Sequence, residues 1–177
     1  MQRRYLLAAS AAVSLLLSTS SHVFSQDSQE KNRLDSFTPV TDDVLLNPPD
    51  GDWLHWRRTY DGWGYSPLDQ INKQNVKDLS VAWTWSLTPG ATETTPIVRD
   101  GVLHIHNNLD KIQALDGATG DLLWEYTRDL PEAVVEAGGN TATKRNMAIY
   151  QDKLIVATSD THIIALDAKT GQLVWDV

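Results

Sequence analysis

The sequence predicts an all-β fold made of repeated four-stranded units. The first observation is an eleven-residue pattern, A-x-D-x-x-T-G-x-x-x-W, which reads ALDGATGDLLW over residues 114–124 and ALDAKTGQLVW over residues 165–175. The second is the offset of 51 residues between the copies, which also superposes apolar positions well upstream of the pattern. The third is a content of seven tryptophans in a chain with weak helical periodicity. Repeats of about this length are typical of propeller blades, each of which buries its apolar face against a neighbour.

Each repeat is expected to form a small antiparallel sheet of four strands. Short apolar runs alternate with turn signals, as in propeller blades. Asp100-Gly101 marks one tight hairpin, because glycine tolerates a positive φ. The expected strands are 95–98, 102–106, 111–115 and 122–126 in the first unit, and 147–150, 153–157, 162–166 and 173–175 in the second.

The repeated pattern has a mechanical interpretation. Its aspartate is expected to accept hydrogen bonds from turn backbone N–H groups, and its glycine to supply the conformation at which the outer strand begins. Its tryptophan presents a large flat ring with one N–H donor, and burying such a ring is worth about 1.5–3 kcal/mol or more. The pattern therefore predicts that blades dock on one another. The docking residues are Asp116, Gly120, Trp124, Asp167, Gly171 and Trp175.

Composition excludes several classes of function. The 177 residues contain no cysteine, so a disulfide, a thiolate metal site and a thiol nucleophile are all excluded. The formal net charge is −8, and removal of Arg3 and Arg4 with a leader makes it −10. A charge of this sign argues against binding to nucleic acid or to anionic membranes. The sequence also has no phosphate-binding glycine loop and no G-x-S-x-G nucleophile elbow.

Residues 1–25 are interpreted as a secretory signal peptide. Two arginines precede a 13-residue apolar stretch, and Val23-Phe24-Ser25 offers a cleavage site before Gln26. The apolar stretch is shorter than the roughly 17–25 residues that a membrane-spanning helix needs. We therefore expect export to a periplasm, with membrane contact only through the export signal; an uncleaved anchor is the alternative.

The mature chain is expected to have two parts. Residues 26–47 are polar with few aromatics, which predicts a flexible lead-in. Residues 48–177 carry the repeats and are expected to be a portion of a propeller.

Two further stretches resemble one family. They read DWLHWRRTYDGWGYSPLDQIN over residues 52–72 and NVKDLSVAWTWSL over residues 75–87. With the repeats, they resemble the N-terminal part of pyrroloquinoline-quinone (PQQ) dependent alcohol dehydrogenases of the methanol/ethanol dehydrogenase group, over residues 51–177. The Y-S-P-L-x-Q-I-N stretch adds most of the specificity, because other PQQ-repeat propellers also carry the docking pattern.

The resemblance implies an eight-bladed propeller, a closed ring without exposed sheet edges. This chain would supply an incomplete part of it, namely a closing strand over residues 79–85 and about two blades, and would be inactive alone. The resemblance further implies oxidation of an alcohol or polyol to the carbonyl, with PQQ as hydride acceptor and Ca²⁺ or a lanthanide as Lewis acid. Electrons would pass to a periplasmic cytochrome c or to a quinone acceptor.

Three residues match positions that line PQQ in that family. Glu93 matches the glutamate of the Q-E-A-T-P turn and would share a hydrogen bond at the cofactor's rim. Arg145 matches the arginine of V-N-R-G, and its guanidinium would polarise the quinone oxygens. Thr158 matches the threonine of G-T-x-D and would bond an edge oxygen. The alternatives are a solvated loop glutamate, a surface arginine and a threonine that caps its own turn. Metal ligands and the catalytic base lie further along the family's chain, so none is assigned here.

One departure from the family pattern leaves the subgroup open. Many members carry two adjacent cysteines that form a disulfide over the cofactor face, where this chain has Gly139-Asn140. The alternative function is a non-catalytic PQQ-repeat propeller that acts as a periplasmic scaffold, similar to an outer-membrane assembly lipoprotein. The lack of a cysteine to lipidate counts against that alternative.

Two histidines are candidate metal ligands by their spacing. His104 and His106 alternate on one expected strand and therefore share a face. A third ligand at a matching position is not evident, and His162 lies in a different register. We interpret these histidines as strand residues that satisfy their own hydrogen bonds.

Overall fold

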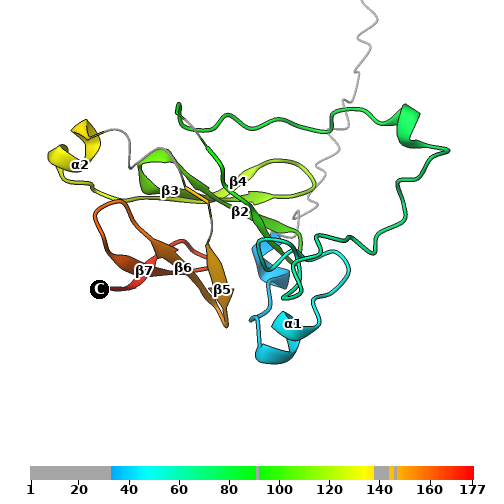
Figure 1. The fold of residues 1–177 in the computed structure, drawn as a ribbon, viewed down its shortest axis with the longest axis horizontal. Coiled ribbons are helices and arrows are strands. Elements are labelled where there is room, and N and C mark those ends of the chain that lie inside the picture. Colours follow the sequence, from blue (N-terminus) through cyan, green and yellow to red (C-terminus); the bar gives the residue numbers. More distant parts are fainter. Residues whose placement is uncertain (1–32, 91, 138–143, 146) are drawn as a thin grey trace, which may run out of the picture. The chain divides into compact units, whose positions relative to one another are not determined.

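Two four-stranded antiparallel sheets form the fold (Figure 1). A computed structural model describes residues 33–90, 92–137, 144–145 and 147–177, all within the unit Lys31–Val177. In each sheet the spatial order of the strands is their order in the sequence. The strands are β1 (Ile97–Arg99), β2 (Val102–Asn107), β3 (Lys111–Asp116) and β4 (Leu122–Thr127) in the first, and β5 (Ala148–Tyr150), β6 (Lys153–Ala157), β7 (Ile163–Asp167) and β8 (Leu173–Asp176) in the second. The all-β prediction is confirmed, and in the two repeats every expected strand end lies within two residues of the observed one.

Short helices precede the sheets, join two strands of the first sheet and connect the two sheets. They are η1 (Arg33–Ser36), α1 (Asp42–Leu46), η2 (Val76–Asp78), η3 (Asn108–Asp110) and α2 (Glu132–Glu136). The hydroxyl of Thr41 accepts a hydrogen bond of 3.4 Å from the backbone N–H of Val44, which caps α1. Within the described ranges, no helix combines the length and the apolar character needed to span a bilayer.

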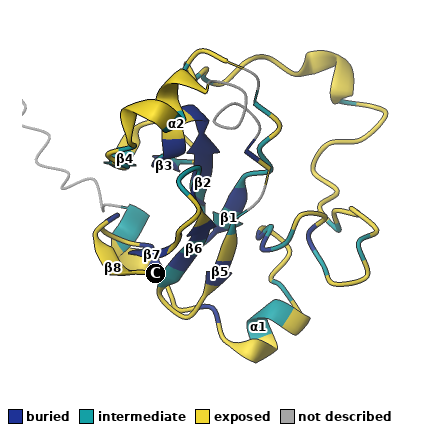
Figure 2. Cartoon of the chain, turned by 60° about the vertical axis from the view of Figure 1, so that its left-hand side comes forward, coloured by how far each residue is buried: buried dark blue, intermediate teal, exposed yellow. Residues whose placement is uncertain are grey.

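The strands pair as the sequence predicts, with short apolar runs separated by turn residues. Asp100 and Gly101 have φ values of 49° and 78°, the mirror-image turn that a right-twisted hairpin prefers. Buried residues concentrate on the inner strands, whereas the outer strand β8 is exposed throughout (Figure 2). The fully buried aliphatic side chains of the core come from both sheets and from the segment before them, and they include Val40, Val102, Ile112, Leu115, Leu154, Val156, Ile164 and Leu166.

The predicted docking of one blade on the next is present. The indole Nε1 of Trp124 donates a hydrogen bond of 3.1 Å to the carbonyl of Ala168 in the second sheet. The ring lies on Gly171, where the Cβ of any larger residue would stand 2.7 Å from the ring atom Cδ2 and closer still to Cε3. Gly171 has a φ of 70°, and the equivalent Gly120 has a φ of 80°. The pattern therefore positions a glycine where no side chain fits between the blades.

The two aspartates of the pattern organise their turns as predicted. Asp116 Oδ1 accepts from the backbone N–H of Ala118 at 2.7 Å and of Thr119 at 3.3 Å. Asp167 Oδ1 accepts from the two equivalent N–H groups at 3.0 Å and 2.8 Å. Trp175 is 37 % exposed and has no docking partner among the described residues, so its docking stays a prediction.

The segment predicted as a closing strand differs from the expectation in one respect. Residues 79–85 form no strand pairing within the described chain. Trp83 nevertheless donates its indole N–H to the carbonyl of Gly117 at 3.1 Å and lies on Gly120. Trp83 thus docks on the first sheet as Trp124 docks on the second. The segment occupies the position of an outer strand of a preceding blade, and the strands with which it would pair are not among the described residues.

Two apolar side chains anchor the segment of residues 33–47, for which the polar composition predicts a flexible lead-in. Phe37 and Val40 are buried in the core, and Val40 forms a β-bridge with Gln151 of the second sheet. A second bridge joins Trp53 to Val98 of β1. Two apolar side chains in a polar segment are too weak a compositional signal to reveal this anchoring. The predicted signal peptide and residues 26–32 lie outside the described residues.

Burial of His104 predicts a stability that declines in mild acid. Desolvation in the core lowers the pKa of His104 from 6.5 to about 4, against the opposing effect of its hydrogen bond to the Ala168 carbonyl. As the pH falls, the unfolded chain takes up this proton before the folded protein does, so stability is lost between pH 6.5 and pH 4 and is unaffected above pH 6.5. The loss amounts to about 2 kcal/mol between pH 6.5 and pH 4.5.

The measurement is urea denaturation as a function of pH. It should use the full-length gene product, meaning the product of the complete reading frame that contains these 177 residues. His104→Gln removes the titrating ring and should flatten the dependence in this window, at a lower overall stability. An equally steep dependence in His104→Gln would contradict the assignment to this residue.

Candidate functional site

Glu93 and Arg145 form an ion pair that faces solvent. Arg145 Nε lies 2.8 Å from Glu93 Oε2, and the side chains are 66 % and 55 % exposed. The backbone carbonyl of Arg145 accepts a hydrogen bond of 2.8 Å from Thr95, immediately before β1. Two of the three residues predicted to line a cofactor are therefore brought together from positions 52 residues apart in the sequence. The Arg145 guanidinium has five N–H donors, and the contact with Glu93 through Nε leaves the others available to a ligand.

Thr158 turns its hydroxyl toward its own turn. The Thr158 side chain is buried, and its Oγ1 lies 2.6 Å from Asp160 Oδ1 and 3.2 Å from the carbonyl of His162. The backbone N–H of Thr158 also donates to that carbonyl, at 2.9 Å. This is the turn-capping geometry that the sequence left open as an alternative. A hydroxyl whose proton is used in this way can still accept a hydrogen bond from a ligand donor.

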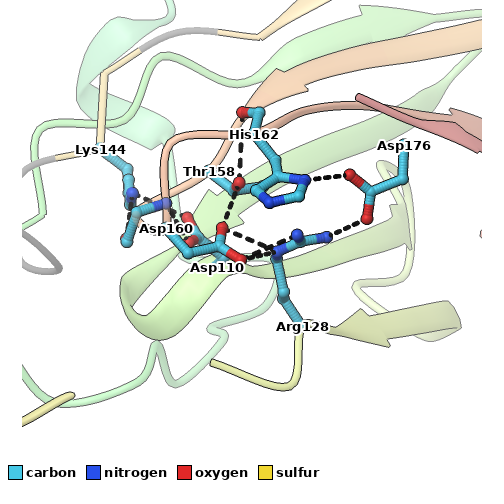
Figure 3. A network of polar contacts seen from close by, with 8 residues as sticks. Asp110, Arg128, Lys144, Thr158, Asp160, His162 and Asp176 are labelled. Carbon is cyan, nitrogen blue, oxygen red and sulfur yellow. Dashed lines mark hydrogen bonds and ion pairs between the residues drawn. The ribbon is translucent and has the colours of Figure 1, made fainter. Parts of the chain in front are cut away.

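A buried carboxylate links the segment of Arg145 to both sheets (Figure 3). Asp110 is fully buried at the end of η3, and its Oδ1 contacts Lys144 Nζ at 2.7 Å and His106 Nε2 at 2.9 Å. Its Oδ2 accepts from the backbone N–H of Ser159 at 2.6 Å. Burial raises the pKa of Asp110, but the hydrogen bonds from His106, Lys144 and Ser159 outweigh it and hold the pKa well below 3.8. Asp110 is therefore a permanent buried anion at neutral pH.

A second set of charges joins the two sheets beyond β4. The Arg128 guanidinium donates to Asp160 at 2.8 Å and to Asp176 at 2.8 Å (Figure 3). Asp176 also contacts His162 Nδ1 at 2.5 Å. The hydrogen bonds to Asp160 and Asp176 outweigh desolvation and raise the pKa of Arg128. This arginine fixes Asp160 and, through it, the hydroxyl of Thr158.

Lys144 and Asp110 are among the members of this network that the sequence does not predict. Lys144 is distinguished there only as a neighbour of Arg145, and Asp110 is not distinguished at all. The signal available in the sequence is N-N-L-D over residues 107–110, whose residue types tolerate turns, and both Leu109 and Asp110 adopt a positive φ. The Gly139-Asn140 stretch lies outside the described residues.

The histidines of β2 have structural partners. His104 Nε2 lies 3.1 Å from the Ala168 carbonyl, and His106 contacts Asp110. Among the described residues, no group of three or more histidine, aspartate or glutamate side chains is arranged to hold a metal ion. We therefore assign no metal ligand to this part of the chain.

Comparison with known proteins identifies the family. A family named PQQ and described as the β-propeller domain of glucose/ethanol/alcohol dehydrogenase matches residues 53–176. The chain belongs to this family. Relatives of the PQQ family include the dehydrogenase subunit of alcohol dehydrogenase (quinone) from Gluconobacter oxydans (strain 621H), which is 44 % identical over 128 residues, 72 % of this chain and 17 % of that protein.

Solved structures of PQQ-family proteins share the fold. The quinohemoprotein alcohol dehydrogenase of Comamonas testosteroni is 34 % identical with a TM-score of 0.64, over 72 % of this chain and 19 % of that chain. A europium-containing methanol dehydrogenase is 30 % identical with a TM-score of 0.69, over 76 % of this chain and 24 % of that chain. The two sheets are therefore blades of a β-propeller. The chain spans about a fifth or less of the length of the curated relatives that it matches.

The residues of the site fit a PQQ-type ligand. Such a ligand is planar and anionic, and carries carboxylate and quinone oxygens that accept hydrogen bonds. Arg145 is a largely exposed donor of matching geometry. The Oγ1 of Thr92, beside Glu93, is buried without a hydrogen-bond partner among the described residues, which leaves one polar atom available to a ligand.

Proposed function

We propose that this chain contributes the cofactor-facing first blades of a PQQ-dependent dehydrogenase that oxidises an alcohol or polyol to the carbonyl. The observation that carries the proposal is the solvent-facing Glu93–Arg145 pair, which joins the start of the first blade to the segment before the second. Family membership supports the same interpretation. PQQ, when bound, would supply the redox chemistry by accepting a hydride equivalent from the alcohol.

The residues of this chain would bind and polarise the quinone. Arg145 would donate to quinone or carboxylate oxygens and stabilise negative charge on them. Glu93 would hold the guanidinium in the plane of its fork, since a carboxylate contact at 2.8 Å restricts the rotation of that group. Thr158 donates its hydroxyl proton to Asp160, so it would accept a hydrogen bond from a donor group of the ligand and would not donate to the edge oxygen that the resemblance implies.

The wider setting of the proposal follows from the family and the leader. We propose a periplasmic protein that uses Ca²⁺ or a lanthanide with PQQ, binds the metal outside residues 1–177, and passes electrons to a cytochrome c or a quinone. The europium in the name of one structural neighbour and the quinone in the name of the Gluconobacter relative support these choices of metal and acceptor. The 177 residues alone would be inactive, because they span about a fifth or less of the relatives' length and blades need neighbours to bury their apolar faces.

Arg145→Met is expected to weaken binding of PQQ to the full-length gene product by about tenfold to a hundredfold. Hydrogen bonds to charged groups contribute about 1.5–3 kcal/mol, and about 1.4 kcal/mol is tenfold in affinity. Binding is measured by quenching of tryptophan fluorescence in the presence of Ca²⁺ or a lanthanide. Turnover is measured with an artificial electron acceptor and a panel of primary alcohols.

The matched control is Arg57→Met. Arg57 is also exposed, but its guanidinium lies over the ring of Trp56, 4.7 Å from the centroid. Arg57→Met should bind PQQ as the parent does. The proposal fails if the parent neither binds PQQ nor reduces the acceptor with any of the metals.

A further inference from the structure

The side chain of the residue before Arg145 is buried, whereas that of Arg145 is exposed. Lys144 is 10 % exposed in its side chain, whereas Arg145 is 66 % exposed. One residue of this pair is therefore available to hold the segment, while the other is available to a ligand.

We propose that Lys144 is a positioning residue for the quinone site: its ammonium group, held between Asp110 of the first blade and Ser159 of the second, fixes the backbone from which Arg145 reaches Glu93. This inference rests on the proposed function, because it treats the Glu93–Arg145 pair as the ligand-binding group. Lys144 itself touches neither Glu93 nor the space that the pair faces in any described contact.

The first argument is the number and origin of the contacts. Lys144 Nζ lies 2.7 Å from Asp110 Oδ1 and 2.5 Å from Ser159 Oγ. Asp110 ends the β2–β3 connection, and Ser159 follows β6, so the two partners belong to different sheets. A flexible four-carbon side chain loses considerable rotamer freedom when it is held in this way. The two contacts therefore define the position of the 144–145 segment against both blades.

The second argument is the rigidity of the partner. Asp110 is held on its other sides by His106 Nε2 at 2.9 Å and by the Ser159 backbone N–H at 2.6 Å. Leu109 and Asp110 both have a positive φ, 56° and 49°, a strained conformation that persists only where the surroundings impose it. The carboxylate cannot follow Lys144 if the lysine moves. Asp110 is thus a fixed reference point for the ammonium group.

The third argument is the orientation of Arg145. The carbonyl of Arg145 accepts from the Thr95 N–H at 2.8 Å, two residues from Glu93. That single backbone hydrogen bond fixes the distance to the Glu93 segment but leaves rotation about it. Lys144, adjacent in the chain and held in a buried position by Asp110 and Ser159, would remove this rotation. The guanidinium would then be presented in one orientation before the ligand arrives, which preserves affinity.

The test is a double-mutant cycle in the full-length gene product. Lys144→Met removes the ammonium and keeps the length of the side chain. Because an unpaired Asp110 is costly to bury, Asp110→Asn/Lys144→Met serves as the second variant that retains the fold. Lys153→Met is the matched control, since Lys153 pairs with Asp152 in an exposed ion pair of the same blade. Dissociation constants for PQQ are measured by fluorescence quenching, at a temperature where circular dichroism shows each variant folded.

We expect Lys144→Met and the Asp110→Asn/Lys144→Met variant to raise the dissociation constant about tenfold, and Lys153→Met to leave it unchanged. In the Arg145→Met background, Lys144→Met should have no further effect, because the group that it positions is gone. A general structural role would instead weaken binding equally in both backgrounds. A readout that needs no ligand is hydrogen exchange at the Thr95 amide, which should accelerate in Lys144→Met and not in Lys153→Met.

The outcomes separate the two proposals. If the parent does not bind PQQ, the proposed function fails and takes this inference with it. If Arg145→Met weakens binding but Lys144→Met binds as the parent does, or if the two effects multiply, only the positioning role of Lys144 is overturned. Unchanged exchange at Thr95 in Lys144→Met would overturn it as well.

Discussion

Gly171→Ala is expected to destabilise the full-length gene product by about 3 kcal/mol, the sum of two separate effects. An alanine at a φ of 70° costs roughly 1–2 kcal/mol, since left-handed backbone crowds its Cβ. The Cβ would also stand 2.7 Å from Cδ2 of the Trp124 ring and closer still to Cε3. Overpacking of this kind costs about 1–3 kcal/mol. The ring is large and flat and is tethered by its N–H to Ala168, so it cannot move aside cheaply.

The measurement is the change in the free energy of unfolding from urea denaturation, with two variants for comparison. Gly51→Ala places a Cβ where no atom lies within 4 Å and should change stability by less than about 0.5 kcal/mol. Trp124→Phe loses the N–H donor and leaves part of the indole's buried volume empty, so it should cost about 1–3 kcal/mol. A Gly171→Ala protein as stable as Gly51→Ala would mean that Trp124 does not dock on this turn.

The docking of blades is predictable from the sequence because its parts are local. Asp116, Gly120 and Trp124 lie close together in the chain, and the repeat displays them twice in register. The docking of Trp83, in contrast, is not predictable from the repeated pattern. It docks on the Gly117–Gly120 turn as Trp124 docks on the next, yet it lacks the preceding A-x-D-x-x-T-G residues that would mark it. Its role depends on the spatial order of the blades, which a pattern in the sequence does not encode.

The candidate site is predictable only in part, for a similar physical reason. Glu93 and Arg145 are identified through the family resemblance, and the structure brings them to 2.8 Å. The buried partners are not identified in this way, since Asp110 and Lys144 are 34 residues apart and neither has a distinctive neighbourhood in the sequence. Charged residues are mostly solvated, so a buried pair is an exception that only the packing reveals.

Polar side chains also help to anchor the N-terminal region to the first blade. Arg99 and Asp52 are almost fully buried, and Arg99 Nη1 lies 2.5 Å from Asp52 Oδ2. The other nitrogens of Arg99 donate to the carbonyl and the hydroxyl of Thr38, at 3.2 Å and 2.5 Å. One arginine of β1 therefore fastens residues 38 and 52 to the first blade. The polar composition of residues 26–47 predicts flexibility, but two polar residues, Thr38 in this segment and Asp52 shortly after it, attach the chain to the first blade.

Asp52→Asn is expected to cost about 3 kcal/mol in the free energy of unfolding. The substitution keeps the shape, and the amide oxygen can still accept from the Asp100 N–H, which lies 3.0 Å from Asp52 Oδ1. It removes the charge that compensates a buried guanidinium, and breaking a buried pair from one side typically costs about 3–5 kcal/mol. The lower end is expected, because Asp100 Oδ2 lies 3.4 Å from Arg99 Nε and supplies part of the lost compensation.

Two comparisons distinguish the loss of charge from a general disturbance of this region. Asp152→Asn removes a carboxylate from the exposed pair with Lys153 and should leave the unfolding midpoint unchanged, as exposed ion pairs contribute little. Asp52→Asn/Arg99→Met removes both charges and should recover a large part of the stability, because no uncompensated ion is then buried. If the double variant were less stable than Asp52→Asn, the hydrogen bonds from Arg99 to Thr38 would outweigh the pair itself. The attachment of the N-terminal segment would then depend on the arginine as a donor, and Thr38→Val should reproduce most of the loss.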